Sequence, residues 1–140
     1  MEILIKKISL INPELECDFF SLIQEASKVP NTLDWNEISK KTARDYLQSF
    51  ISSINSAVYF IYANKTLVSA GIALREDEAA VIKLLCIHPD YHGKGLGPKM
   101  LNLIEQFATS QRLKNIHAKI SKVKRIEEFY LLNHFTVSRE

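Results

Sequence analysis

The sequence predicts an α/β protein in which a mixed β-sheet is flanked by helices, with elements in the order βααβββαβαβ. The length of 140 residues, with 46 % hydrophobic and 24 % charged side chains, matches one globular domain spanning residues 1–140. Helical spacings alternate with short β-branched runs, without repeats or long linkers. The run 79–88 is almost continuously apolar, which is typical of a central strand buried on both faces. Together these observations favour an α+β arrangement with a mixed sheet.

The first third of the chain predicts one strand and two helices. Residues 1–10 have the apolar, β-branched character of a strand. Asn12 is a suitable N-cap and Pro13 suits the first position of a helix, which should end near Lys28 because Val-Pro follows. The spacing of apolar residues predicts a second helix over 39–51.

The middle of the chain predicts three consecutive strands. Residues 57–63 and 67–74 read as two strands joined by a short polar turn at 64–65. The acidic segment 75–78 is expected to form the next turn, and 79–88 the third strand.

The last third predicts alternating helices and strands. A helix is expected from Pro98, where apolar residues recur at helical spacing. A strand over 115–120, a helix over 124–133 and a short strand over 135–138 should follow.

The composition narrows the location and the partners of the protein. No apolar run approaches the ~18 residues of a membrane span, and the N-terminus does not resemble a signal peptide, so we expect a cytoplasmic protein without a membrane partner. Cys17 and Cys86 are too few for a disulfide framework and are expected to be reduced core thiols.

A basic stretch without acids lies between Glu105 and Glu127. Its members are Arg112, Lys114, Lys119, Lys122, Lys124 and Arg125. A solvated basic face is the simpler interpretation, and a surface that attracts a polyanionic ligand is the alternative. The stretch lacks interleaved aromatic residues, and no DNA-reading helix is apparent, so a nucleic-acid partner is not favoured.

The glycine-rich corner after the strand 79–88 carries most of the functional information. Gly93, Gly95 and Gly97 stand at alternate positions before the predicted helix, which leaves backbone N–H groups uncovered at a helix N-terminus, a geometry that binds phosphate. A Walker A loop does not fit, because the required Lys-Ser or Lys-Thr pair is missing. A dinucleotide fingerprint does not fit either, because Met100 takes the place of its third glycine.

The corner resembles the acyl-CoA site of the GNAT N-acetyltransferases. That family's pattern is Arg or Gln, two residues, Gly, one residue, then Gly or Ala, after an apolar strand, a proline and an aromatic residue. The chain has Pro89, Tyr91, Gly95 and Gly97 in register, with His92 in place of Arg or Gln. The order of elements also resembles that fold over nearly the whole chain. The resemblance implies an N-acetyltransferase in which a primary amine, not identified by the sequence, directly attacks the thioester of acetyl-CoA.

By the same resemblance the corner and the strand before it hold acetyl-CoA. The implied contacts are Leu85, Cys86, Ile87, His92, Gly93, Lys94, Gly95, Leu96, Gly97, Pro98 and Lys99. The corner would bind the pyrophosphate, and the strand residues would offer backbone groups to the pantetheine arm. Either ring nitrogen of His92 can donate to a phosphate oxygen. No metal is expected, because Pro89 and the turn prevent a helix that would align His88 with His92.

The resemblance also suggests the chemical groups, with alternatives left open. Tyr130 matches the residue that protonates the departing CoA thiolate in many members, with a role as a core aromatic residue as the alternative. Lys83 stands where several members place a base glutamate, and the base could instead be a water chain or one of the carboxylates Glu76, Asp77 and Glu78.

The acceptor would approach over the first two helices and their loop. Leu33, Asp34, Trp35 and Tyr46 are therefore candidate acceptor contacts, with purely structural roles as the alternative. A non-catalytic acyl-CoA-binding module or sensor remains a rival to the enzyme. His134 replaces the family's glycine, and little chain follows the last predicted strand. The family's usual final strand is thus expected to be absent or supplied by a partner chain, as in a homodimer.

Overall fold

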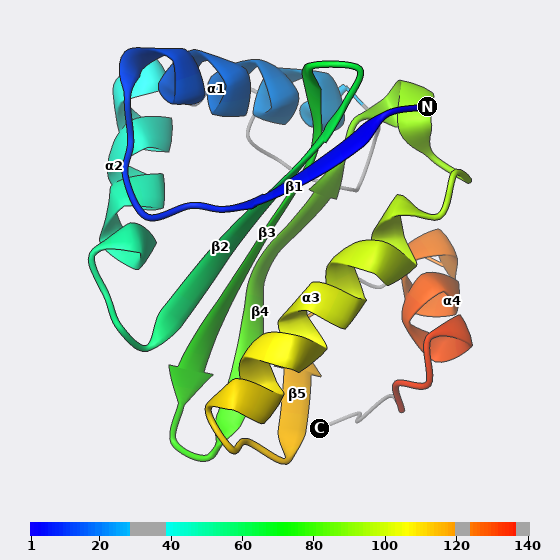
Figure 1. The fold of residues 1–140 in the computed structure, drawn as a ribbon. Coiled ribbons are helices and arrows are strands. Elements are labelled where there is room, and N and C mark those ends of the chain that lie inside the picture. The colour runs from blue at the N-terminus through cyan, green and yellow to red at the C-terminus, as the bar shows by residue number, and fades with distance from the viewer. Residues whose placement is uncertain (29–38, 120–123, 137–140) are drawn as a thin grey trace.

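The computed structural model describes residues 1–28, 39–119 and 124–136. Its centre is a five-stranded mixed sheet with the strands side by side in chain order. The strands are β1 (Ile3–Lys7), β2 (Ser56–Ala63), β3 (Thr66–Glu76), β4 (Ala79–Ile87) and β5 (Asn115–Ala118). The first four pair antiparallel and β5 runs parallel to β4 (Figure 1). The predicted mixed sheet is confirmed.

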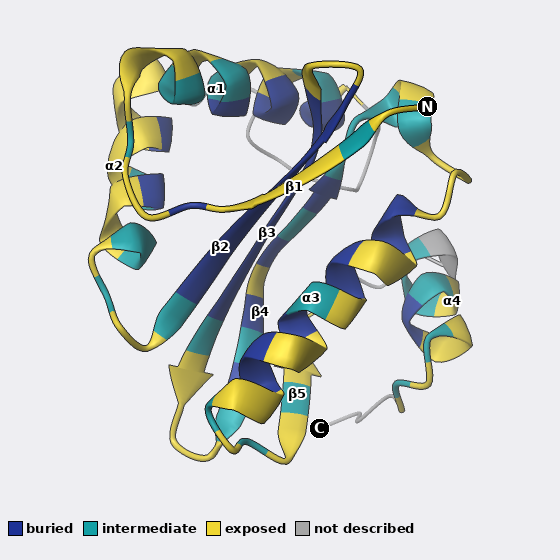
Figure 2. Cartoon of the chain, in the orientation of Figure 1, coloured by how far each residue is buried: buried dark blue, intermediate teal, exposed yellow. Residues whose placement is uncertain are grey.

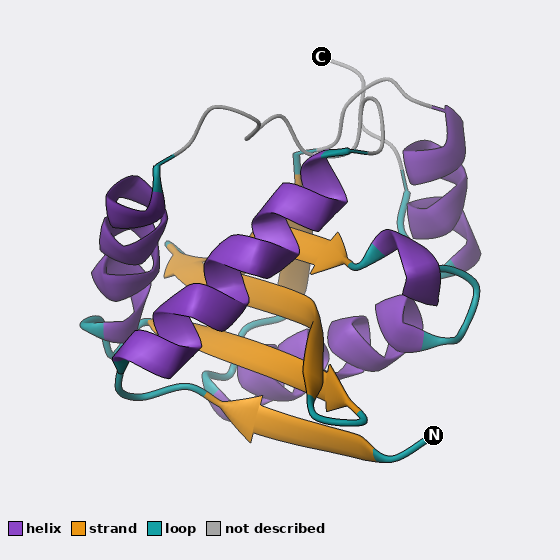
Figure 3. Ribbon diagram, turned by 90° about the horizontal axis from the view of Figure 1, so that it is seen from above, coloured by secondary structure: helices purple, strands orange, loops and turns teal. Residues whose placement is uncertain are grey.

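Helices cover both faces of this sheet and enclose two hydrophobic clusters. The helices are α1 (Pro13–Ser27), α2 (Lys40–Ile51), α3 (Leu96–Ser110) and α4 (Lys124–Leu132), with a short 3₁₀ turn η1 (Pro89–Tyr91) after β4. One cluster lies between the sheet and the pair α1 and α2, and the other between the sheet and the pair α3 and α4 (Figure 3). Among the described helices, none is long and apolar enough to cross a membrane.

The first two helices each begin with a side-chain cap, and the one at Asn12 was predicted. The side chain of Asn12 accepts a hydrogen bond from the Leu15 N–H at 2.8 Å, and Ser39 caps α2 by accepting from the Thr42 N–H at 3.1 Å. Each cap satisfies a donor that the helix itself leaves without an acceptor. α1 ends at Ser27 with Lys28 as C-cap, as the sequence predicts.

The hairpin between β2 and β3 also follows the prediction. Asn64 and Lys65 both have positive φ, 48° and 70°, as a two-residue type I′ turn requires. The next predicted turn, over 75–78, was too long, because Arg75 and Glu76 still pair with β4 and only the two residues after them form the turn.

The prediction for the strand over 79–88 is confirmed in its position, because β4 lies inside the sheet between β3 and β5, but it was wrong in its burial, because β4 is not fully buried on both faces. β2 and β3 are the strands buried on both faces, as Figure 2 shows, whereas burial along β4 alternates and Lys83 is exposed. β4 has a neighbour on its outer side only as far as Ile82, where its pairing with β5 ends. β4 is therefore an interior strand along its first half only.

Three further predictions need correction. α3 begins at Leu96 and not at Pro98, because Gly95 takes the N-cap position. Cys17 is exposed on α1 instead of lying in the core, while Cys86 is buried as expected. Phe135 and Thr136 belong to no strand, and the remainder of the strand predicted over 135–138 lies outside the described residues.

Candidate functional site

The corner between β4 and α3 combines two left-handed glycines with an open helix N-terminus. Gly93 and Gly95 have φ of 76° and 80°, a conformation that favours glycine. The Lys99 N–H donates to the Gly95 carbonyl at 3.3 Å, so the preceding N–H group of Leu96 lies ahead of the helix's own hydrogen bonds, as does that of Gly97. Pro98, the third helical residue, has no N–H. This end of α3 therefore presents backbone donors and a positive dipole to an anion.

Gly97 serves a different purpose from the other two glycines. A Cβ at this position would lie 2.5 Å from Cε1 of Phe129, closer than real side chains approach. The missing side chain lets α4 pack directly against the first turn of α3. The corner is thereby fixed to the helix that carries Tyr130.

A β-bulge at Lys83 divides β4 into a paired and an open half. Ile72 of β3 pairs with Leu84 and the next residue, Ala73, pairs with Ile82, which leaves Lys83 without a partner across the ladder. The parallel pairing of β4 with β5 also ends at Ile82. From Lys83 onward, no described strand hydrogen-bonds to the outer edge of β4.

The open half of β4 points the backbone groups of alternate residues outward. The His88 N–H donates to the Val68 carbonyl of β3 at 2.8 Å. Backbone groups alternate along a strand, so those of Cys86 also face β3, whereas those of Leu85 and Ile87 face the open edge. The three residues predicted to contact pantetheine are thus split between the two sides of the strand.

Two histidines contact the backbone on either side of η1. Nδ1 of His88 accepts a hydrogen bond from the Asp90 N–H at 3.1 Å, and the Asp90 carboxylate lies 4.0 Å from the same nitrogen. Nε2 of His92 lies 3.2 Å from the carbonyl oxygen of Ile87. His92, expected to face a phosphate, therefore already uses one ring nitrogen on the end of β4.

Two lysines lie in the corner. The ammonium group of Lys94 is 5.2 Å from the ring centroid of Tyr91, within the range of a cation–π interaction. Lys99 is exposed in the first turn of α3. Both add positive charge beside the open N–H groups, which favours an anionic ligand.

Tyr130 lies in the core beneath this corner. Its side chain is buried, and its ring packs against those of Phe129 and Phe135 with centroid distances of 5.1 Å in each case. Burial raises the pKa of Tyr130 to about 12, so the phenol stays protonated at neutral pH. Its hydroxyl makes no hydrogen bond to any residue that the structure describes.

Tyr46 is the only predicted acceptor contact among the described residues, because Leu33, Asp34 and Trp35 lie outside them. Its hydroxyl donates to the carbonyl of Lys83, the bulge residue, at 3.3 Å. Burial raises its pKa to about 12, which keeps the donor protonated. The contact attaches α2 to β4 where the strand opens.

The side chain of Lys83 forms an ion pair with one of the proposed bases. Its ammonium nitrogen lies 2.6 Å from Oε1 of Glu76 at the end of β3. Asp77 and Glu78, the other carboxylates considered, lie in the exposed turn that follows. The structure thus brings Lys83 and Glu76 together at the same end of the sheet as the bulge.

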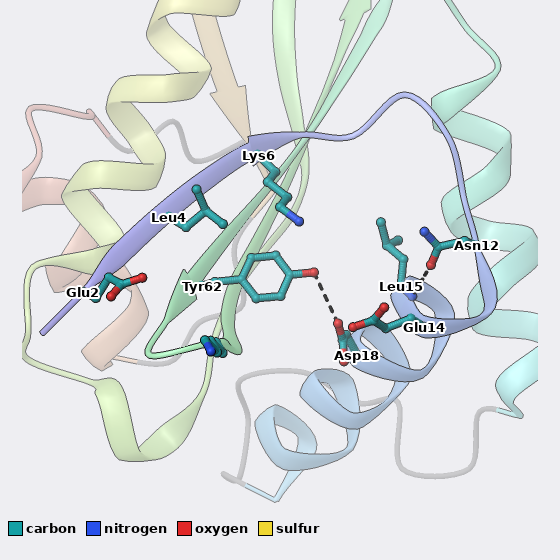
Figure 4. A pocket seen from close by; sticks show the side chains of 9 residues that line it. Glu2, Leu4, Lys6, Asn12, Glu14, Leu15, Asp18 and Tyr62 are labelled. Atoms are coloured by element: carbon teal, nitrogen blue, oxygen red, sulfur yellow. Dashed lines mark hydrogen bonds between the residues drawn. The ribbon is translucent and has the colours of Figure 1, made fainter.

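A separate cavity of about 310 Å³ lies between β1 and the first half of α1 (Figure 4). The Tyr62 hydroxyl donates to Asp18 at 3.3 Å there, and the ammonium group of Lys6 lies 5.1 Å from the Tyr62 ring centroid. These polar groups satisfy one another, and none belongs to the corner. Within the described parts of the chain, no group of three or more metal-ligating side chains is placed to hold an ion.

Sequence reasoning missed the bulge, the cap made by His88 and the contact of Gly97 with Phe129. A histidine two residues before an N–H donor is a local signal that could have indicated the cap. The other two features depend on pairing and packing between distant segments, for which the sequence carries no local signal.

Comparison with known proteins gives a consistent result. The model of the GNAT acetyltransferase domain matches residues 24–139. An acetyltransferase from Streptococcus agalactiae superposes with a TM-score of 0.80 at 22 % identity, covering 98 % of this chain and 85 % of the other. A search of curated protein sequences gave no significant match.

Two further solved structures share the fold. AAC(6')-Iy, an aminoglycoside N-acetyltransferase in complex with a CoA-containing bisubstrate analog, has a TM-score of 0.77 at 9 % identity, covering 100 % of this chain and 94 % of the other. Glucosamine-6-phosphate N-acetyltransferase from Arabidopsis thaliana has a TM-score of 0.76 at 12 % identity, with 100 % and 95 % covered. At such identities the similarity concerns the fold.

Proposed function

Because this chain belongs to the GNAT acetyltransferase family, we propose that it transfers an acetyl group from acetyl-CoA to a primary amine by direct attack on the thioester. One observation carries the proposal. The open edge of β4, from Lys83 to Ile87, leads through the corner to the N–H groups at the start of α3. We call this continuous line of backbone groups the donor track. It matches a ligand with an extended amide arm joined to a pyrophosphate.

The pyrophosphate of acetyl-CoA occupies the corner in this proposal. The N–H groups of Leu96 and Gly97 donate to its oxygens at the positive end of α3. Lys94 and Lys99 add charge, and Gly93 and Gly95 let the backbone approach the phosphates without side chains. Pro98 has no N–H group and donates no hydrogen bond to the ligand.

The pantetheine arm lies along the open half of β4 as an added strand. Its amides pair with the outward-facing backbone groups of Leu85, and with those of Ile87 that His92 leaves available. Cys86, whose backbone faces β3, contributes packing. The thioester would then lie beside the bulge at Lys83, next to the Tyr46 hydroxyl.

Tyr130 acts in this scheme as a donor to the leaving group. With a pKa raised to about 12, the phenol is a weaker acid than an ordinary thiol of pKa ~8.5, so complete proton transfer to the thiolate is unfavourable. Tyr130 instead stabilises the departing thiolate by a hydrogen bond. The C–S bond breaks as the C–N bond forms, and the proton that the amine nitrogen loses supplies the S–H of CoA.

We place the acceptor on the side of α1 and α2. We assign Tyr46 to it, together with the sequence candidates Leu33, Asp34 and Trp35. The ion pair of Lys83 with Glu76 makes Glu76 less available as a base, so water or the exposed carboxylates of the next turn are the better candidates. No covalent enzyme intermediate is needed, since positioning of two bound substrates suffices.

The experiment measures thiol release from acetyl-CoA across a panel of amines that includes aminoglycosides and glucosamine 6-phosphate, beside calorimetric binding of CoA. Amine-dependent release supports the proposal. Binding of CoA without release to any amine would favour a non-catalytic acyl-CoA-binding module, a rival that the pairing of Lys83 with Glu76 makes worth testing. Absence of CoA binding would reject both.

We further propose a cytoplasmic location and a homodimer. The unpaired thiols suit a reducing compartment, and the outer edge of β5 carries no strand within the described residues, so a second copy could extend the sheet there. Light scattering at rising concentration tests the dimer, and a strict monomer would contradict it.

A further inference from the structure

His88 and His92 stand on either side of η1, and each directs one ring nitrogen to the backbone. His88 reaches forward and accepts from the Asp90 N–H at 3.1 Å. His92 reaches back to the carbonyl of Ile87 at 3.2 Å. Two side chains thus cross the same short turn in opposite directions and connect the end of β4 to the start of the glycine loop.

The chemistry of the two contacts fixes the protonation of both rings. A backbone N–H can only donate, so Nδ1 of His88 carries no proton and the neutral ring has its hydrogen on Nε2. A carbonyl can only accept, so Nε2 of His92 carries a hydrogen. Both contacts are satisfied when both rings are neutral Nε2–H tautomers.

We propose that His88 and His92 are positioning residues that brace the corner as a pair of Nε2–H imidazoles and hold it in the shape that accepts the CoA pyrophosphate. The inference rests on the proposed function for its ligand, while the brace itself is a property of the ligand-free protein. Neither residue needs to touch the thioester. Their effect is to hold the open edge of β4 at a fixed distance from the N–H groups of Leu96 and Gly97.

The corner has reason to need such a brace. Gly93 and Gly95 have left-handed backbones and nothing within 4 Å of where a Cβ would be, so the loop has little packing of its own. Glycine also leaves the unbound loop more conformational freedom than any other residue. A site ordered before its ligand arrives binds more tightly than one that must be ordered by the ligand. The hydrogen bonds of His88 and His92 to the backbone restrict the loop before the ligand arrives.

Protonation of His88 would remove its part of the brace. A proton on Nδ1 eliminates the acceptor for the Asp90 N–H. Among the residues that the structure describes, the charged groups facing this ring are the Asp90 carboxylate at 4.0 Å and, from α1, Glu25, which is paired with Lys28 at 2.8 Å. The Tyr91 ring meets the His88 ring edge to face, and the backbone N–H of His88 donates to the Val68 carbonyl of β3. Because Glu25 is already paired with Lys28, the Asp90 carboxylate is the group placed to compensate the new charge.

The first test measures tautomers in the ligand-free protein. Nitrogen-15 NMR of the imidazoles distinguishes Nε2–H from Nδ1–H rings, and we expect the Nε2–H form for both His88 and His92 in neutral and mildly alkaline buffer. The Nδ1–H form for either residue overturns the brace at that residue. This readout needs neither CoA nor activity.

The second test pairs each disruptive variant with one that preserves the contact. His88→Asn keeps an acceptor that can reach two residues ahead, and His92→Gln keeps a donor. His88→Leu and His92→Leu keep neither. We expect each leucine variant to raise the Kd for CoA about threefold to tenfold, the scale of one lost hydrogen bond, and the Asn and Gln variants to stay within about twofold of wild type.

His117→Asn on the exposed face of β5 is the matched control and should leave the Kd unchanged. Equal affinities for the leucine variant and its contact-preserving counterpart would overturn the proposal at that residue. Should a leucine variant fail to fold, hydrogen exchange at the Asp90 amide decides the His88 contact, and we expect a protected amide in wild type and in His88→Asn. An Asp90 amide that exchanges without protection in wild type would contradict it.

Wild-type protein that binds no CoA would count against the proposed function, while the tautomers would still report on the brace.

Discussion

The ring of Phe129 occupies the space where a side chain at Gly97 would lie, with Cε1 2.5 Å from the ideal Cβ position. The first turn of α3, which carries the open N–H groups, is therefore in direct contact with α4. The Phe129 ring also packs against Tyr130. Phe129 therefore contacts both the predicted phosphate site and the predicted proton donor.

Substitution of Gly97 by alanine tests this coupling. Alanine gains up to ~1 kcal/mol of helix propensity, whereas overpacking a core contact costs ~1–3 kcal/mol, so we expect a net loss of about 1 kcal/mol in the free energy of unfolding. CoA affinity should fall as well, because the first turn of α3 must move. Denaturant unfolding and calorimetry measure the two effects.

The double variant Gly97→Ala with Phe129→Leu is the control. Removing the ring tip should restore part of the stability and give a coupling energy above about 0.5 kcal/mol in a double-mutant cycle. Strictly additive losses in the free energy of unfolding would show that the Phe129 ring does not obstruct a side chain at position 97.

Replacing Tyr130 by phenylalanine removes the hydroxyl and keeps the packing. If the phenol stabilises the departing thiolate, kcat should fall about tenfold to a hundredfold with little change in the KM for acetyl-CoA. Tyr59, buried in the same core cluster, provides the matched variant Tyr59→Phe, which should retain full turnover. Unchanged kcat in Tyr130→Phe would show that the Tyr130 hydroxyl has no role in the reaction and that the residue only packs in the core.

The buried tyrosines predict loss of stability in alkali. Burial raises the pKa values of Tyr46, Tyr62 and Tyr130 to about 12 in the folded protein. Their unfolded pKa is ~10, so the folded state binds more protons between these values and the stabilisation is lost as pH rises from ~10 towards 12. Melting temperatures across this range should fall, and phenolate absorbance should appear together with unfolding. Ionisation of these tyrosines in a folded protein at pH 10.5 would contradict the expectation.

Ser27, the last residue of α1, has a buried hydroxyl that finds no hydrogen-bond partner in the described parts of the chain. Ser27→Ala removes this uncompensated polar group, and we expect an increase of about 1 kcal/mol in the free energy of unfolding, or a few degrees in melting temperature. Ser110 offers a control at the end of α3, because its hydroxyl donates to the Phe107 carbonyl at 2.7 Å. Ser110→Ala should not stabilise, and a similar gain in both variants would show that helix propensity is responsible.

Local chemistry explains which parts of the fold were predictable. The cap at Asn12 and the turn at Asn64 and Lys65 are decided by residues adjacent in sequence, and both predictions are confirmed. The extent to which β4 is paired could not be predicted in this way. An apolar run indicates burial but not which strand lies beside it, and here the outer neighbour stops at Ile82.

The same distinction applies to the candidate site. The corner is continuous in sequence, so its glycines were enough to predict it. The contact that requires glycine at position 97 could not be predicted, because it is made with a helix much later in the chain. The bulge at Lys83 and the pairing of Lys83 with Glu76 depend on strand register, which period-two patterns do not encode. The roles of Leu33, Asp34 and Trp35 stay predictions.

The hydrogen bond from Tyr46 to the carbonyl of Lys83 has a consequence for how such a protein can diversify. α2 belongs to the face where the acceptor is proposed to bind, and the bulge begins the donor track. A change in α2 that suits a new amine would move Tyr46 and so alter the opening that receives the thioester. Laboratory selection for a new acceptor should therefore collect compensating changes in β4, or avoid position 46 altogether.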